Sequence, residues 1–174
     1  MNIRDEIVAR RRARVAAEGH ALGADVPAAV PTARTAPLVR FLRAPRLVCE
    51  IKRKSPSRGA IDATLDPVEL AGRYVNRGVR SVSVLTEEDS FAGSLADLMA
   101  VKRAHPNLAV LRKDFLVDDE DVEARIRAGA DAVLLIASVL SGDELARMHE
   151  LAGELGMAAL VELHEDEDFE KARA

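Results

Sequence analysis

The chain has 174 residues, of which 48% are hydrophobic and 3% aromatic, so it is long enough for one domain with a substantial core but not for two full domains. A formal net charge of -4, from 25 basic and 29 acidic residues mixed along most of the chain, gives no indication of a nucleic-acid partner. The sequence has no apolar run of signal-peptide or bilayer-spanning length and a single cysteine, Cys49, which together favour a cytoplasmic protein with no membrane partner.

The first 45 residues are expected to form a helical extension ahead of the main fold. Apolar residues recur there at near-helical spacing among charged ones: Ile3, Ile7, Val8 and Val15. This spacing predicts a helix over residues 1–20, followed by a linker and a short amphipathic segment over residues 38–42. The helix carries one basic cluster: Arg10, Arg11, Arg12 and Arg14. Because acidic residues precede this cluster, we interpret it as a solvated polar face rather than a nucleic-acid-binding arm.

A repeated pattern begins at Leu47, in which a short apolar run is followed by a polar loop and a longer amphipathic segment. Such units are typical of βα repeats, with a buried strand followed by a helix. Five apolar runs predict five strands, at residues 47–51, 79–85, 109–111, 132–137 and 158–163. The strand spacing of roughly 25 to 33 residues fits successive right-handed βαβ connections.

Three helix-to-strand joints use the same residue type. Gly78, Gly129 and Gly156 each stand just before a predicted strand. Glycine tolerates the left-handed backbone that closes a helix, so the three joints look like one construction used repeatedly. The intervening helices also begin at plausible capping residues: Asp66, Ser94, Asp118 or Asp119, and Ser141.

Alternating strands and helices are compatible with an open doubly wound sheet or with a closed barrel. The first strand-to-helix turn, KRKSPSRG, lacks the G-x-G-x-x-G pattern that lets a backbone approach a dinucleotide closely. The sequence therefore favours the α/β class and a (β/α)8 TIM barrel, which is incomplete here, with about five βα units over residues 46–174.

Charged residues fall at the carboxyl ends of alternate predicted strands. Glu50 and Lys52 are two residues apart on the first strand, Lys113 follows the third, and Glu162 closes the fifth. In a barrel, alternate strands contribute side chains to the same interior layer, so we expect these groups to converge at the barrel mouth. Buried amines and carboxylates are costly unless paired, and their pKa values are then open to tuning for proton transfer.

Each of these residues also has a plainer interpretation, because a lone charged residue at a strand end is usually solvated. Lys113 could pair with its neighbour Asp114, and Glu162 could be a surface carboxylate beside His164. Four such residues on alternate strands are harder to explain in this way. The histidine spacing matches no metal-ligand pattern, so no metal site is expected.

Five segments carry a more specific pattern, in strand order: CEIKRKSPSRG, SVLTEEDSFAGS, LRKDFLVD, ADAVLLIASVL and LVELHEDEDFEKA. In order and spacing they resemble the indole-3-glycerol phosphate synthase family. The resemblance runs from about residue 48 to the end of the chain, and residues 1–45 are similar to the extension that precedes the family's barrel.

The resemblance implies a decarboxylating ring closure of 1-(2-carboxyphenylamino)-1-deoxyribulose 5-phosphate to indole-3-glycerol phosphate, a step of tryptophan biosynthesis. Lys113 matches the family's general acid, which protonates or polarises the alkoxide that develops at the ketone. Lys52 would hold the anthranilate carboxylate and act in dehydration with Glu162, and Glu50 would support the lysines electrostatically. The implied substrate is a small phosphorylated molecule, and neither a metal nor an organic cofactor is implied.

Three further residues match substrate-binding positions of the family. Ser55, in the SPSRG loop, matches a segment that reaches the substrate phosphate, although alone this loop would be a simple turn. Phe91 and Phe115 match apolar walls around the aromatic ring, although an isolated phenylalanine is more often plain core.

The sequence contains no counterpart of the family's strands six to eight. We therefore expect the chain alone to have negligible synthase activity and poor solubility, unless a complementing chain or self-association covers its open sheet edges. Two other functions stay open. One is another phosphate-binding barrel, such as a relative of phosphoribosylanthranilate isomerase, and the other is a non-catalytic remnant that binds a partner or ligand through the half-built mouth.

Overall fold

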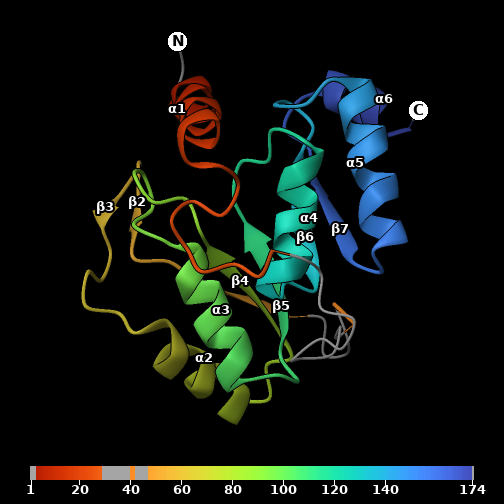
Figure 1. Cartoon of the computed structure of the whole chain (residues 1–174). Helices are drawn as coiled ribbons and strands as arrows, with labels where there is room; N and C mark the ends of the chain where they lie inside the picture. The colour runs from red at the N-terminus through yellow and green to blue at the C-terminus, as the bar shows by residue number, and fades with distance from the viewer. Residues whose placement is uncertain (1–2, 29–39, 42–46, 174) are drawn as a thin grey trace.

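The computed structural model describes residues 3–28, 40–41 and 47–173. Its centre is a five-stranded parallel sheet in which the strands lie side by side in chain order, β1-β4-β5-β6-β7 (Figure 1). The strands β2 (Lys54–Ser55) and β3 (Gly59–Ala60) form a separate hairpin. The strands of the sheet are β1 (Val48–Ile51), β4 (Ser81–Leu85), β5 (Ala109–Lys113), β6 (Ala132–Ile136) and β7 (Ala158–Glu162). The five predicted strands are confirmed, and β5 extends two residues beyond its predicted end, so that Lys113 is its last residue.

Six helices accompany the described strands: α1 (Ile3–Glu18), α2 (Pro67–Asn76), α3 (Leu95–Ala104), α4 (Asp119–Ala128), α5 (Gly142–Glu154) and α6 (Asp166–Arg173). The helix predicted over residues 1–20 is confirmed as α1, whereas the segment predicted over residues 38–42 lies largely outside the described residues. The division into residues 1–45 and 46–174 stays a prediction. No helix in the described part of the chain is long and apolar enough to cross a membrane.

Outward-facing residues of the strands pack against the helices. Val82 and Val84 of β4 share a core with Leu98 of α3, and Leu135 of β6 shares a second core with Met148 of α5. All five side chains are at most 1% exposed. Fully burying one such side chain contributes about 1.5–3 kcal/mol, so these contacts hold the helical layer on one face of the sheet.

The opposite, inner face of the sheet has a smaller core. Leu111 of β5 packs there with Ala132, Leu134 and Ile136 of β6. Side chains alternate between the two faces of a strand, so Lys113 points to the same face as Leu111, one step closer to the carboxyl end. The inner face therefore changes from apolar to charged where the strands end.

Burial falls toward the two edges of the sheet. Residues of β4 and β6 are buried along their whole length, whereas β7 is half-buried and its Leu160 is 39% exposed. Within the described residues, β1 and β7 each pair with one strand. This parallel arc with helices on one side is consistent with an incomplete (β/α)8 barrel.

The predicted joints and caps are confirmed. Gly78, Gly129 and Gly156 have φ values of 84°, 96° and 73°, the left-handed region that favours glycine. Ser141 forms a capping box with Glu144 at the start of α5. The remaining caps accept backbone N–H groups of the first helical turn: Asp66, Ser94 and Asp118.

Two features at the carboxyl end of the sheet were not predicted. A short antiparallel hairpin, β2 (Lys54–Ser55) with β3 (Gly59–Ala60), follows β1. Helix α1 lies over the loops that follow the strands, and its side chains hydrogen-bond with loops after β4 and β6 (Figure 1). Both features bring additional residues to the end of the sheet where a barrel enzyme has its active site.

Candidate active site

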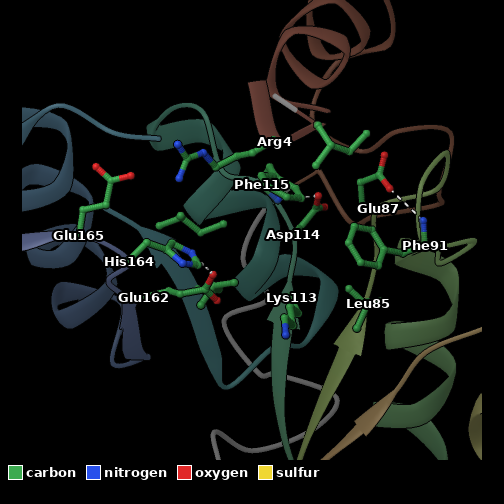
Figure 2. Close-up of a pocket in the computed structure, with 13 residues that line it drawn as sticks. Arg4, Leu85, Glu87, Phe91, Lys113, Asp114, Phe115, Glu162, His164 and Glu165 are labelled. Carbon is green, nitrogen blue, oxygen red and sulfur yellow. Dashed lines mark hydrogen bonds and ion pairs between the residues drawn. The ribbon is translucent and has the colours of Figure 1, made fainter. Parts of the chain in front are cut away.

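A cavity of about 530 Å³ opens at the carboxyl ends of the strands (Figure 2). Most of its wall is apolar, formed by Leu85, Phe91, Phe115, Leu134 and Ile136. Lys113 of β5 and Glu162 of β7 also line it, with Arg4 of α1 at its rim. A largely apolar cavity with a few polar groups is the usual form of a small-molecule site.

A carboxylate on β1 joins the two predicted lysines. Lys113 Nζ donates to Glu50 Oε2 at 2.8 Å, and Lys52 Nζ donates to the other carboxylate oxygen. Burial alone would raise the pKa of Glu50, but hydrogen bonds from Lys113 and Lys52 and their charges hold that pKa below its ordinary value. Glu50 is therefore ionised at neutral pH and holds both ammonium groups at this end of the sheet.

Glu162 lies on the cavity wall and also beside a histidine. Its Oε1 is 2.7 Å from Nε2 of His164, which lines the same cavity (Figure 2). The glutamate side chain is 35% exposed, so it is accessible to solvent and to a ligand in the cavity. The structure thus brings Lys113 and Glu162 to one cavity, whereas Lys52 is connected to it through Glu50.

Lys113 is held by Glu50, whereas the plainer interpretation of that lysine expected Asp114 as its partner; Asp114 has other partners. Its carboxylate accepts hydrogen bonds from Arg112 at 2.5 Å, from the Thr86 hydroxyl at 2.8 Å and from the Phe115 backbone N–H at 2.8 Å. The side chains of Asp114 and Arg112 are fully buried. Because these contacts fix the Asp114 side chain on one face of the strand end, the side chain of its neighbour Lys113 points to the opposite face, toward Glu50.

Glu87 lines the cavity and was missed by sequence reasoning. Its Oε2 accepts the backbone N–H groups of Ser90 at 2.7 Å and of Phe91 at 3.1 Å, and so it orders the turn that presents the Phe91 ring (Figure 2). Burial, together with nearby Asp114, raises the pKa of Glu87 despite these hydrogen bonds. The only signal in the sequence was a carboxylate directly after a buried strand.

The turn after Phe91 depends on a close approach of two backbone segments. A Cβ atom on Gly93 would lie 2.1 Å from the carbonyl oxygen of Leu85, a separation that no side chain can adopt. Only glycine fits this position without displacing β4 or the loop. The position of Phe91 on the cavity wall is therefore fixed by Glu87 on one side and Gly93 on the other.

Ser55 lies in the β2–β3 hairpin, outside the set of residues that line the cavity. It is 7% exposed, and its Oγ accepts the backbone N–H of Arg58 at 3.2 Å. These contacts are those of a turn. The role of Ser55 toward a phosphate stays a prediction.

The basic cluster of α1 is only partly solvated, so the interpretation as a solvated polar face was wrong for Arg11. Arg10 donates to Ser90 Oγ at 3.0 Å, Arg11 is 5% exposed, and Arg14 pairs with Glu88. Arg10 and Arg12 are exposed, whereas Arg14 is half-buried. Helical periodicity identified the helix but could not reveal that Arg11 is buried against acidic residues distant in the sequence.

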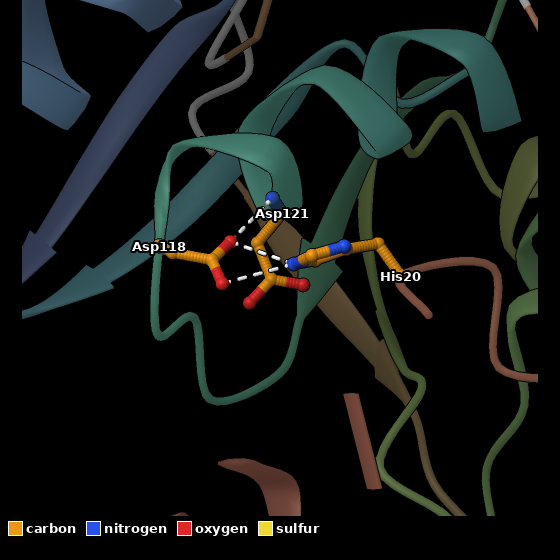
Figure 3. Close-up of side chains that lie close together, drawn as sticks. All are labelled: His20, Asp118 and Asp121. Carbon is orange, nitrogen blue, oxygen red and sulfur yellow. Dashed lines mark hydrogen bonds and ion pairs between the residues drawn. The ribbon is translucent and has the colours of Figure 1, made fainter. Parts of the chain in front are cut away.

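His20, Asp118 and Asp121 form a compact group of possible ligand atoms, all within 4.8 Å of one another (Figure 3). The Nε2 atom of His20 lies 2.8 and 2.9 Å from the two Asp118 oxygens, and Asp121 binds the Arg11 guanidinium at 2.7 Å. A cation at this position would compete with Arg11 for Asp121. The contacts present are those that attach α1 and the following turn to the start of α4.

Parallel βα repeats with an apolar cavity at the carboxyl ends, lined by an amine and a carboxylate, define the class of (β/α)-barrel enzymes. The comparisons with known proteins identify the family. The model of the family described as indole-3-glycerol phosphate synthase matches residues 4–174, and the chain belongs to this family.

Named relatives agree with this assignment. The indole-3-glycerol phosphate synthase of Nocardioides sp. is 43% identical over 178 residues, covering 100% of this chain and 68% of the relative. That of Geobacillus kaustophilus is 42% identical, covering 84% of this chain and 58% of the relative. That of Rhodococcus jostii is 48% identical, covering 72% of this chain and 46% of the relative. The chain thus spans between about half and two thirds of the length of these relatives.

Proposed function

We propose that this chain carries the ring-closing residues of an indole-3-glycerol phosphate synthase, which acts on a phosphorylated small-molecule substrate. The observation that carries the proposal is the Lys113–Glu50–Lys52 network beside an apolar cavity with two phenylalanine walls. Family membership supports the same assignment.

The first step of the proposed reaction joins the aromatic ring to the sugar-derived chain. The ring carbon that bears the carboxylate attacks the ketone carbon, the ketone oxygen takes up a proton, and carbon dioxide leaves from the ring. Lys113 would donate that proton or polarise the developing alkoxide. Its 2.8 Å hydrogen bond to Glu50 supports this role, because it holds the ammonium group at the carboxyl end of the inner face.

The second step loses the resulting hydroxyl group as water, which requires one group to donate a proton and another to accept one. We assign this exchange to Lys52 and Glu162, with Lys52 also holding the anthranilate carboxylate. The accessibility of Glu162 at the cavity wall supports its role. Glu50 would keep both lysines in place throughout.

Substrate binding would use the walls of the cavity and the neighbouring hairpin. Phe91 and Phe115 would flank the aromatic ring, which is supported by their position on the cavity wall. Ser55 would reach the phosphate from the hairpin after β1. In this scheme Lys113 acts on the ketone between these two ends of the substrate.

Two other functions compete with this proposal. Another phosphate-binding barrel would not need two lysines on one carboxylate beside Glu162. A non-catalytic remnant would bind a ligand or a complementing chain, for which the half-buried strand β7 supplies an edge. A cytoplasmic location is also part of the proposal and is supported by the single cysteine.

Turnover of the substrate separates these functions. The chain would be assayed alone and after co-expression with the part of the Nocardioides relative that its match leaves uncovered, by the fluorescence of indole-3-glycerol phosphate. We expect turnover that Lys113→Met abolishes and that Arg103→Met, an exposed substitution on α3, leaves unchanged. A folded complex without turnover would favour the non-catalytic remnant.

A further inference from the structure

Helix α1 reaches several strand-to-helix loops with a single basic face. Arg4 donates to Ser138 after β6, at 2.7 Å, and Arg10 donates to Ser90 after β4, at 3.0 Å. Between them Arg11 lies over the loop after β5, and its guanidinium is 2.7 Å from Asp121 in the first turn of α4. That middle loop begins directly after Lys113.

The contacts of Arg11 differ from those of its neighbours because they are buried. Its side chain is 4% exposed and the Asp121 side chain 0%. Burial lowers the pKa of Arg11, but the charges of Asp114 and Asp121 outweigh this effect and raise it. Arg11 is therefore a permanent cation between two carboxylates, one at the start of the β5–α4 loop and one in the first turn of α4.

Both carboxylates that Arg11 faces also fix the backbone of this loop. Asp114, 3.7 Å from the guanidinium, accepts the N–H of Phe115 at 2.8 Å. Asp121 accepts the N–H of Val117 at 2.9 Å. One guanidinium thus holds the two acceptors that define the path of the chain from Lys113 to α4.

We propose that Arg11 is a positioning residue for Lys113 and Phe115. By neutralising and orienting Asp114 and Asp121, it fixes the loop so that the Lys113 ammonium stays on Glu50 and the Phe115 ring stays on the cavity wall. Its catalytic consequence rests on the proposed function, whereas its effect on the loop does not. Helix α1 thereby contributes to the site without the Arg11 side chain lining the cavity.

Hydrogen exchange tests the positional effect on the full chain, independently of turnover. Arg11→Met keeps the length of the side chain and removes its charge, and Arg12→Met is the matched control on the exposed face of the same helix. We expect Arg11→Met to speed exchange at the Phe115 and Val117 amides by about tenfold or more, with the Leu134 amide of β6 unchanged. Equal changes at all three amides, or none, would refute the proposal.

A second variant covers the case in which Arg11→Met does not fold because two buried carboxylates lose the Arg11 charge, although Asp114 keeps its contact with Arg112. Arg11→Met combined with Asp121→Asn removes one of these charges and keeps an oxygen acceptor for Val117. In this variant we expect faster exchange at Phe115 alone, and an unchanged Phe115 rate would again refute the proposal.

Kinetics of the active preparation then test the consequence for catalysis. Arg11→Met should lower kcat by about tenfold while KM changes little, because Lys113 is displaced from the reacting ketone, and Arg11→Lys should restore part of that loss. Arg12→Met should leave both constants unchanged. If wild-type chain shows no turnover but the loop amides respond as expected, the proposed function fails while the positioning role of Arg11 stands. A loss confined to KM would refute the positioning of Lys113.

Discussion

Lys113 and Glu50 meet across an intervening strand: the Lys113 Nζ lies 2.8 Å from Glu50 Oε2, although β4 separates their strands in the sheet. The contact is possible because both side chains point to the inner face, and in a barrel alternate strands contribute to the same layer. Two residues 63 positions apart in the sequence therefore form one charged unit. We expect substitutions in this unit to change turnover and the free energy of unfolding by different amounts.

Replacing Lys113 should affect turnover far more than folding. Lys113→Met removes the proposed general acid, and loss of such a group costs on the order of 10²–10⁴-fold in rate. Its side chain is 36% exposed, so the free energy of unfolding should change little. Steady-state kinetics and urea unfolding of the same preparation measure both effects. A parallel loss of stability and activity would indicate a structural role instead.

Glu50→Gln should lower the free energy of unfolding at neutral pH. This destabilisation should disappear in acid. The folded-state pKa of Glu50 lies below the ordinary value of 4.5, so its ionised form contributes stability that is fully present above that value and is lost as the pH falls through the folded-state pKa. We expect a loss of about 1 kcal/mol near neutral pH that shrinks below pH of about 4.5. Urea unfolding across this range measures it, with Glu150→Gln on α5 as the exposed control. A difference that does not vary with pH would contradict the ion-pair explanation.

Glu87→Gln should show the opposite dependence on pH. The pKa of Glu87 is raised above its ordinary value of 4.5, chiefly by burial, so the folded protein binds this proton more tightly than the unfolded chain. Wild-type stability should therefore fall as the pH rises from 4.5 through the folded-state pKa, and the glutamine variant should not share that loss. Glutamine keeps an oxygen that can accept the Ser90 and Phe91 N–H groups. Thermal unfolding of the two proteins on either side of this interval provides the measurement, and curves that stay parallel would rule out a raised pKa.

Much of the fold could be predicted because it depends on local patterns. Apolar runs located all five strands of the parallel sheet, and glycine joints with φ near 84° at Gly78 marked where helices end. The same approach missed the β2–β3 hairpin, because two-residue strands such as Lys54–Ser55 are too short to show any periodicity. It also ended β5 too early, because charged Arg112 and Lys113 interrupt the apolar run although both continue the strand.

Two arguments predicted the candidate site: alternate strands of a barrel contribute side chains to the same layer, and the sequence resembles a known family. These two arguments brought Lys113 and Glu162 to one end of the sheet. They could not identify Arg11 as buried, because its partners Asp114 and Asp121 lie more than 100 positions away in the sequence. They also overlooked Glu87, whose importance comes from two backbone N–H groups rather than from another charged side chain.

Gly93→Ala should be among the most destabilising single methyl additions in the chain. The added Cβ would lie 2.1 Å from the Leu85 carbonyl oxygen, and backbone rather than a flexible side chain would have to move. We expect a loss of about 2 kcal/mol or more in the free energy of unfolding, together with displacement of Phe91 from the cavity. Gly153→Ala is the matched control, because a Cβ there meets nothing within 4 Å. The control should stabilise α5 by about 0.5 kcal/mol, and equal effects of the two substitutions would disprove the close-approach argument.

Lys102→Met tests whether the end of the sheet opposite the cavity is held by a buried ion pair. Lys102 Nζ lies 2.7 Å from Asp131 Oδ2, and the side chains are 3% and 0% exposed. Removing the amine leaves a buried carboxylate without its cation, which costs about 3–5 kcal/mol. Asp131 also accepts the Val110 N–H of β5 at 2.9 Å, and an asparagine would keep that oxygen. The double substitution Lys102→Met with Asp131→Asn should therefore recover part of the loss in chemical unfolding experiments. A double variant as unstable as the sum of the two single variants would show that the two residues are not coupled.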